Sequence, residues 1–402
     1  MRRLALVLAI AGCGLLARPA APRAAEPATA AADSLAGYAD ISRHGRLALF
    51  KAEQQRAAGD KDGAARSLAA WTAANAESDH YLIEFELGSL LAGLEQPAEA
   101  RAAFRRATQL EPRHAESWLN LGELAYQAGD YDEAATAIHQ GYQLSPGHPA
   151  HLLYAAAAAR ILAGRQAEAL PLLEELIYTR SELAKLDWYR ALIAACLETD
   201  AKAQGRRAVE HMLARYRTQA DAWQIAYQYH VGAAEYRDAA VALTVTGYLR
   251  PLSEGEQVQL GNLYTAAGLP ALAGNCYAAA LSDSAGPGDF ERLAAAYLAA
   301  HDRQAALATL GRALTAQPSP RLWSLLGDLH YLDADYAAAL TAYGHCVELE
   351  PRSGRALLMQ GYCALELGRQ QEALPLLEQA AAFPEQAESA GRLLARLRSQ
   401  TP

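Results

Sequence analysis

The feature that most constrains this chain is a residue pattern that returns every 34 positions along most of its length. The pattern places a small residue, an apolar pair and a proline at fixed offsets in successive segments. A period of this length indicates an array of similar supersecondary units, not one globular domain with a single centre. The clearest correspondences between segments 81–114 and 115–148 are Leu87-Gly88 with Leu121-Gly122, Ala100 with Ala134, Phe104 with Ile138, and Pro112 with Pro146.

Segment 115–148 shows what one unit is expected to form. Trp118 and the apolar residues after it recur at helical spacing, and Gly129-Asp130 ends this first helix with a turn. A second apolar helical stripe follows and stops at Pro146. Gly122 and Ala134 are small enough to let the two helices approach closely. One such hairpin buries too little surface to be stable alone, so neighbouring units must stack.

These positions resemble the tetratricopeptide repeat, a helix-turn-helix unit with Trp, Leu-Gly, Tyr, Ala, Phe, Ala and Pro at fixed offsets. The resemblance implies an all-α fold, a right-handed α-solenoid of about ten repeats with a C-terminal capping helix. The solenoid is expected over 45–387, and residues 388–402 are expected to form the capping helix and tail. The expected repeats lie near 45–78, 81–114, 115–148, 150–183, 185–219, 220–253, 254–286, 287–319, 320–353 and 354–387.

Two repeats depart from the pattern. Segment 45–78 keeps only the signature of its second helix, and segment 185–219 has Leu192 and Gly205 where a glycine and an alanine are expected. The sequence 281–288 replaces the tight linker found elsewhere, which predicts a relaxed joint at that point.

The amino terminus has the layout of an export signal over residues 1–25, followed by an Ala/Pro-rich tether and the start of a first helix at 26–44. Two processing sites compete. A lipobox-like sequence at 10–13 would make Cys13 a lipidated first residue, whereas ordinary cleavage near Ala24 or Ala25 would release the chain. We therefore expect an exported protein, periplasmic and either soluble or lipid-anchored, which touches a membrane only through that anchor.

Composition and motifs argue against several functional classes. The formal charge of −9 disfavours nucleic acid as a partner. His148 and His151 are the closest histidine pair and lack a third ligand, and Cys346 with Cys363 is the best candidate for a disulfide. No catalytic or phosphate-binding motif occurs, so we expect no cofactor, no metal and no enzymatic activity.

The resemblance implies that partners bind a groove lined by the first helix of each repeat. A protein or peptide partner is expected there, since tyrosine and amide side chains combine apolar area with hydrogen bonding. The cationic clamp by which some family members grip a terminal carboxylate is missing at the matching positions. The predicted groove residues are Phe85, Ser89, Leu119, Glu123, Tyr126, Tyr154, Tyr189, Gln224, Gln228, Asn262, Asp328, Tyr331 and Tyr362.

The whole-chain layout predicts a non-enzymatic scaffold for protein–protein interactions at a bacterial cell envelope. It resembles the repeat proteins that accompany TonB–ExbB–ExbD energy transducers. Two alternatives remain open at this stage. One is an outer-membrane lipoprotein scaffold for peptidoglycan hydrolases, pili or barrel assembly, and the other is a ligand- or glycan-handling protein that uses the tyrosine-rich groove.

Overall fold

The computed structural model describes residues 40–282 and 285–400, and it is entirely α-helical apart from turns in these ranges. The export signal, Cys13 and the cleavage sites near Ala24 and Ala25 lie outside the described residues. The chain divides into two compact units, residues up to Tyr216 and residues from Arg217. None of the described helices is long and apolar enough to cross a bilayer.

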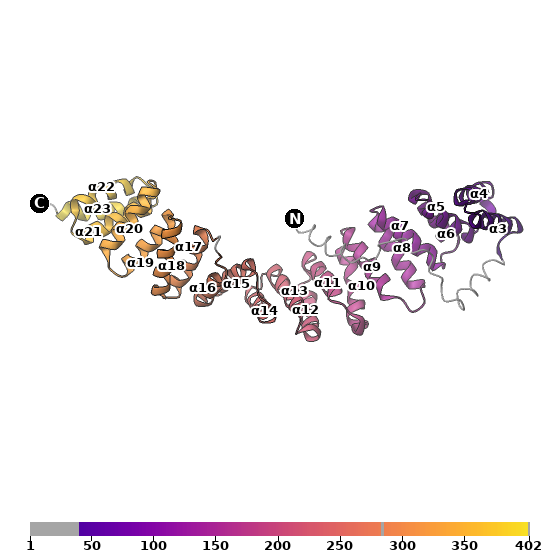
Figure 1. The fold of residues 1–402 in the computed structure, drawn as a ribbon, viewed down its shortest axis with the longest axis horizontal. Coiled ribbons are helices and arrows are strands. Elements are labelled where there is room, and N and C mark those ends of the chain that lie inside the picture. Colours follow the sequence, from indigo (N-terminus) through magenta and orange to yellow (C-terminus); the bar gives the residue numbers. More distant parts are fainter. Residues whose placement is uncertain (1–39, 283–284, 401–402) are drawn as a thin grey trace. The chain divides into compact units, whose positions relative to one another are not determined.

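Unit 1 consists of five helical hairpins (Figure 1). A π-helical turn (Glu175–Thr179) and a 3-10 turn (Ser181–Leu183) follow the fourth hairpin, where the sequence contains an extra residue. Its helices are α3 (Arg43–Ala57), α4 (Lys61–Ala74), α5 (Tyr81–Gly93), α6 (Pro97–Leu110), α7 (Ala115–Gln127), α8 (Tyr131–Leu144), α9 (Ala150–Leu162), α10 (Gln166–Glu174), α11 (Leu186–Glu198) and α12 (Lys202–Tyr216).

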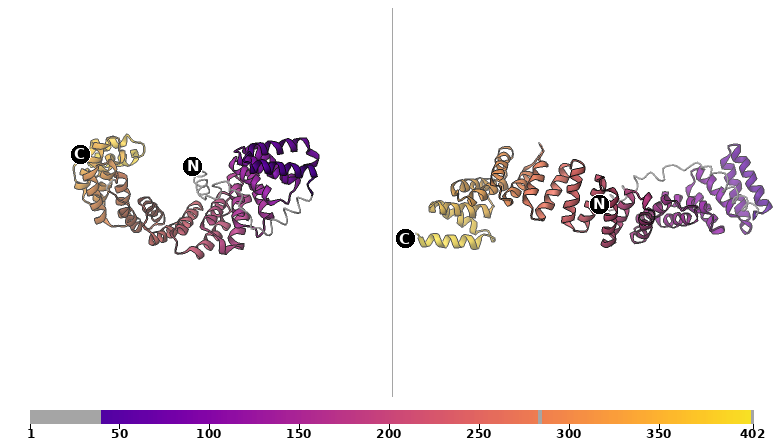
Figure 2. Two further views of the ribbon diagram at one scale, coloured as in Figure 1. Left: turned by 45° about the vertical axis from the view of Figure 1, so that its right-hand side comes forward. Right: turned by 90° about the horizontal axis from the view of Figure 1, so that it is seen from below.

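Unit 2 consists of five further hairpins and one terminal helix (Figure 2). The terminal helix packs against the last hairpin, where the capping helix was expected. Its helices are α13 (Ala220–Gly232), α14 (Tyr236–Leu249), α15 (Glu254–Ala266), α16 (Pro270–Ala279), α17 (Pro287–Ala299), α18 (Arg303–Ala316), α19 (Pro320–Leu332), α20 (Tyr336–Leu349), α21 (Gly354–Glu366), α22 (Gln370–Ala381) and α23 (Ala387–Gln400).

The all-α hairpin architecture predicted from the repeat is confirmed by these helices. In the hairpin α7–α8, a Cβ atom added to Gly122 would lie 2.6 Å from Cγ1 of Ile138 and 3.4 Å from the carbonyl oxygen of Ala134. The small residue therefore permits the close approach inferred from the sequence. Within each unit, a hairpin buries further apolar residues against the next one, so the core clusters include residues from adjacent hairpins.

The turn inside each of the ten hairpins contains one residue with a positive φ angle, between 55° and 86°. Only half of these residues are glycines, although glycine adopts this backbone conformation most easily. In several turns an aspartate directly follows the positive-φ residue and caps the second helix. Asp130, for example, accepts a hydrogen bond from the backbone N–H of Glu133. The ten turn residues are Gly59, Glu95, Gly129, Gly164, Asp200, Ala234, Gly268, His301, Ala334 and Gly368.

The two weak repeats form complete hairpins. Although segment 45–78 keeps only the signature of its second helix, its first helix α3 is complete, and Leu49 and Ala52 of α3 are buried against α4 and α5. The predicted joint at 281–288 includes residues 283 and 284, which lie outside the described residues. On either side of them, Tyr277 of α16 and Leu293 of α17 share one core cluster.

Candidate partner-binding surface

The predicted groove residues do not all lie on an exposed face. Tyr154 and Tyr189 are buried, so their expected exposure was wrong. The ring of Tyr154 stacks on Trp188 of the next hairpin with centroids 6.1 Å apart. The hydroxyl of Tyr189 lies 2.7 Å from Nδ1 of His211. In this part of unit 1, neighbouring helices cover positions that sequence phase alone assigned to the groove.

Several other predicted residues of unit 1 contribute to packing. Phe85 makes edge-to-face contacts with Phe104 and His114 at centroid distances of 5.7 and 5.0 Å. The hydroxyl of Ser89 donates to the carbonyl of Phe85 at 2.8 Å, and Leu119 lies against Gly141 of α8. These contacts stabilise the hairpins; Phe85 and Leu119 are partly buried by them, whereas Ser89 stays exposed.

Glu123 and Tyr126 of α7 are only partly buried. Burial raises the pKa of the Glu123 carboxyl group, which accepts a hydrogen bond from Gln127 at 3.3 Å. The ring of Tyr126 lies against Tyr131, the first residue of α8, with centroids 5.4 Å apart. This corner of unit 1 therefore presents two adjacent tyrosines.

In unit 2, Gln224, Gln228 and Asn262 lie apart from the other predicted residues. Gln228 is exposed, and Asn262 accepts a hydrogen bond from the Tyr277 hydroxyl at 2.9 Å. The side-chain oxygen of Gln224 is buried and has no hydrogen-bond partner among the described residues. These three residues supply polarity but no shared site.

The predicted residues Tyr331 and Tyr362 come together with a third tyrosine that the sequence did not single out, Tyr336. We call these three residues the tyrosine cluster. Ring centroids are 5.5 Å apart for Tyr331 and Tyr362, 6.0 Å for Tyr331 and Tyr336, and 6.4 Å for Tyr336 and Tyr362. The cluster joins α19, the start of α20 and α21. The recurrence of a tyrosine directly after a hairpin turn, as at Tyr131, was the signal that could have found Tyr336.

Asp328 lies one helical turn before Tyr331 and organises the polar side of the cluster. Its carboxylate accepts a hydrogen bond from the Tyr343 hydroxyl at 2.7 Å and two from Arg355, at 2.8 and 3.0 Å. Arg355 also donates to the Ser324 hydroxyl at 3.0 Å, so its guanidinium group is fixed in place although its side chain is largely exposed. The contact between α19 and α21 therefore carries this ion pair and, about one helical turn further on in α19 and about two in α21, the rings of Tyr331 and Tyr362.

The environment keeps the hydroxyl groups of Tyr362 and Tyr343 protonated at physiological pH. Burial, together with the nearby hydroxyl of Tyr331, raises the pKa of Tyr362 to about 12. Burial and the hydrogen bond to the Asp328 carboxylate raise the pKa of Tyr343 as well. Next to the cluster, Leu332 is 67% exposed and adds an apolar side chain to the surface. The surface thus combines aromatic, aliphatic and charged groups.

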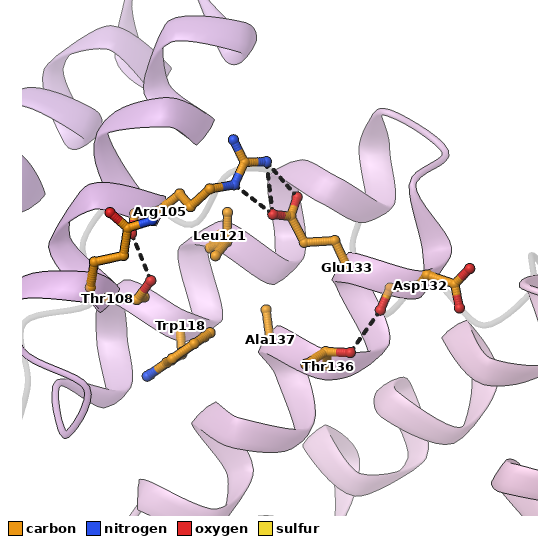
Figure 3. Close-up of a pocket in the computed structure, with 9 residues that line it drawn as sticks. Arg105, Thr108, Trp118, Leu121, Asp132, Glu133, Thr136 and Ala137 are labelled. Atoms are coloured by element: carbon orange, nitrogen blue, oxygen red, sulfur yellow. Dashed lines mark hydrogen bonds and ion pairs between the residues drawn. The ribbon is translucent and has the colours of Figure 1, made fainter.

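A separate hollow of about 420 Å³ lies in unit 1, among α6, α7 and α8 (Figure 3). The ring of Trp118 lines it, and Arg105 donates to Glu133 across it at 2.7 and 2.9 Å. None of its lining residues belongs to the predicted groove, and its charged groups are already paired, Arg105 with Glu133 and Asp132 with Arg165 outside the hollow. The hollow is therefore part of the packing between successive second helices.

One group of metal-ligating side chains occurs among the described residues, at the turn between α13 and α14. His230, Glu235 and Asp238 have ligand atoms within 4.8 Å of one another, and Nδ1 of His230 lies 2.7 Å from the Glu235 carboxylate. The corresponding turn of the α19–α20 hairpin has His330 4.0 Å from Asp335, with Ala338 in the third position. In both hairpins this histidine–carboxylate pair links the end of the first helix to the residue that precedes the second helix. Of the two histidines closest in the sequence, His148 and His151, the first has its Nδ1 3.1 Å from the carbonyl oxygen of Tyr142.

The described cysteines offer neither a disulfide nor an activated nucleophile. Cys196, Cys276, Cys346 and Cys363 are buried free thiols, so the candidate bridge between Cys346 and Cys363 is absent from the structure. Burial raises the pKa of Cys196 and of Cys363 to about 11, which keeps both protonated.

Comparison with known proteins identifies the repeat. The family model described as tetratricopeptide repeat matches residues 85–149, 291–345 and 333–388. This chain contains tetratricopeptide repeats. Proteins with such repeats bind protein partners, and the remaining hairpins continue the same architecture. No curated protein matches the sequence.

Solved structures with similar folds share little sequence identity with this tetratricopeptide-repeat protein. The structure of Naa15/Naa10 bound to HypK-THB is 16% identical with a TM-score of 0.46, and the match covers 92% of this chain and 62% of that one. YrrB, a TPR protein with an unusual peptide-binding site, is 16% identical over 47% of this chain and 98% of its own, with a TM-score of 0.38. Yeast Tom70 is 12% identical over 88% and 94%, with a TM-score of 0.34.

Proposed function

We propose that this protein is a non-enzymatic scaffold that captures a protein partner on the first helices α19 and α21. The observation that supports the proposal is the tyrosine cluster beside the Asp328–Arg355 pair. Tyrosine and arginine are the residue types that most often dominate binding energy at protein interfaces. Here a network within unit 2 holds them in place, which reduces the entropy lost when a partner binds.

The chemistry of the surface defines the kind of partner. Leu332 and the three rings offer apolar area for an aliphatic or aromatic anchor residue of the partner. The tyrosine hydroxyls and Arg355 offer hydrogen-bond donors around that area. A peptide or a partner helix with one apolar anchor and flanking acceptor groups matches this arrangement.

Substitution at the cluster tests the proposal. The double variant Tyr331→Ala and Tyr362→Ala should lower partner affinity by at least about a hundredfold, because each tyrosine anchor contributes on the order of 2 kcal/mol. The matched control is Tyr236→Ala with Tyr248→Ala on α14. Both control tyrosines are exposed, Tyr248 to 85%, and they lie on a second helix of the same unit.

The partner is first captured by crosslinking in cells, identified by mass spectrometry and then titrated against the purified variants. Circular dichroism should show that both variants keep their helix content. Loss of binding in the control pair, or undiminished binding in the cluster variant, would move the site away from α19 and α21. Tyrosine fluorescence quenching by a small glycan, without any captured protein, would favour a ligand-handling role instead.

We further propose that the scaffold is exported and acts at a bacterial cell envelope, as an accessory of a TonB-type transducer. The support is the export-like layout of residues 1–25 and the resemblance of the whole-chain layout to such accessories. Mass spectrometry of the protein from its native membrane or periplasm distinguishes the processing routes. A diacylated Cys13 or a new terminus near Ala24 or Ala25 supports export, and an unprocessed cytoplasmic chain contradicts it. Crosslinks to pilus, wall-hydrolase or barrel-assembly proteins would replace the transducer as the partner.

A further inference from the structure

Helix α3 exposes two large apolar side chains on the face that points away from the rest of unit 1. Leu47 is 58% exposed and Phe50 is 62% exposed. The opposite face is firmly packed, since Leu49 and Ala52 are buried in the core formed with α4 and α5. The exposure of Leu47 and Phe50 is therefore a property of a well-anchored helix.

The same repeat position is buried in six of the nine later hairpins and partly buried in the other three, at Leu152, Glu256 and Asp289. Leu47 corresponds in the repeat frame to Ile83 of α5 and to Leu322 of α19, both of which are 0% exposed. Helix α3 begins the first hairpin, so no described helix covers this position (Figure 1). Terminal repeats usually carry a polar outer face for this reason. An apolar outer face here indicates that another surface covers it.

The charged residues around the apolar pair show what that surface is. At 100° per residue, Arg43, Leu47 and Phe50 fall on one face of the helix, with Arg46 and Lys51 on its two sides. All three cations are exposed, and none of them forms an ion pair with another described residue. This positive cluster contrasts with the net charge of −9 of the whole chain.

We propose that this face of α3 binds the surface of an anionic phospholipid bilayer. Leucine and phenylalanine side chains enter the boundary between headgroups and acyl chains, while arginine and lysine pair with lipid phosphates. The helix lies in the plane of the interface and does not cross it. This inference is independent of the partner-binding surface on α19 and α21.

Other coverings fit the charges less well. A second copy placed symmetrically on this face would bring two sets of three cations together, which repel each other. The preceding residues 1–39 contain four arginines and only two acidic residues, Glu26 and Asp33, so their net charge is positive, like that of this face of α3. An anionic bilayer supplies both kinds of contact: its phosphate groups carry negative charge, and its acyl chains form an apolar layer.

Photocrosslinking from position 50 tests the proposal directly. The full chain, with Phe50 replaced by p-benzoylphenylalanine, is irradiated on vesicles of equal parts phosphatidylglycerol and phosphatidylcholine, and on vesicles of phosphatidylcholine alone. The matched control carries the same photoreactive residue at Leu349 of α20, which is also exposed but lies between Glu348 and Glu350. Both proteins contain the same apolar amino terminus, so that segment cannot cause a difference between them.

We expect phospholipid adducts at position 50, more on the anionic vesicles, and few at position 349. Replacing Arg43, Arg46 and Lys51 together with glutamine should reduce adduct formation at position 50 about a hundredfold, since each cation near an anionic surface contributes about a fivefold change in partitioning. High salt should have a similar effect. Adducts to residues 1–39 or to a second copy, equal lipid adducts at both positions, or no adduct at position 50 would each overturn the proposal.

Discussion

Gly327 of α19 lies directly against the ring of Tyr343 of α20: a Cβ atom at Gly327 would be 2.7 Å from Cε1 of that ring. The ring cannot retreat, because Tyr343 is completely buried and its hydroxyl is held by Asp328 at 2.7 Å. The helix that carries the tyrosine cluster is therefore positioned by the absence of one side chain. The binding surface and the core of this hairpin depend on the same contact.

Gly327→Ala should destabilise unit 2 by about 1–2 kcal/mol, because overpacking outweighs the better helix propensity of alanine. Gly311→Ala on α18 is the matched control. Gly311 is exposed within a helix, and an added Cβ would meet no atom within 4 Å, so this change should stabilise by up to about 1 kcal/mol. The measurement is the midpoint of chemical denaturation followed by circular dichroism. Equal effects of the two substitutions would show that the Tyr343 contact is unimportant.

Glu256 gives unit 2 a stability that acid removes. Hydrogen bonds from Arg250, at 2.6 and 2.8 Å, hold the pKa of its carboxyl group at about 2, well below the usual value near 4.5. A depressed pKa stabilises the folded state above pH 4.5, and this contribution is lost as the pH falls from 4.5 towards 2. Glu256→Gln should therefore lower the denaturation midpoint at pH 7 and reduce its fall between pH 5 and pH 3. The exposed Glu378→Gln should leave the acid dependence unchanged.

Glu84 of α5 should have the opposite effect on the pH dependence of stability: its contribution falls as the pH rises. Burial, together with the neighbouring Asp79 carboxylate, raises the pKa of Glu84 to about 8. The folded state then favours the protonated form, so the contribution to stability is complete below pH 4.5 and is lost as the pH rises towards 8. Glu84→Gln, which stays neutral, should be relatively more stable than the natural protein at pH 9 than at pH 5. The exposed Glu99→Gln serves as the control, and an equal pH response in all three proteins would contradict the assignment.

The hairpins could be predicted from the sequence because their contacts lie within one repeat. Small residues at the positions of Gly122 and Ala134 mark such a contact in each repeat that keeps the pattern. Even the degenerate segment 185–219 keeps a large and a small residue at these positions: counted from the turn residue Asp200, Ile193 on α11 stands where Gly122 does, Gly205 on α12 stands where Ala134 does, and both are buried. The contact between the two helices of one repeat determines the hairpin, and only the large residue on the first helix was unexpected.

The exposed surface could be predicted only in part, since exposure depends on the next repeat as well. Tyr331 and Tyr362 lie where helical phase places them. Tyr154 is instead covered by Trp188, and Tyr189 packs against His211. Tyr336 was missed because it belongs to a second helix and reaches the surface only at that helix's first residue.

The hairpin turns provide a last prediction about which residues the repeat requires. Gly129 and Ala334 occupy equivalent turn positions with φ angles of 78° and 57°, yet only glycine adopts such angles without steric cost. Gly129→Ala should therefore destabilise its hairpin by about 1 kcal/mol. Ala334→Gly should be neutral or slightly stabilising, because relief of the strained backbone offsets the greater entropy of glycine in the unfolded chain. Hydrogen exchange of the amides in α7–α8 and α19–α20 resolves the two effects within each unit. A clear destabilisation by Ala334→Gly would mean that the alanine is held there by contacts of its own methyl group.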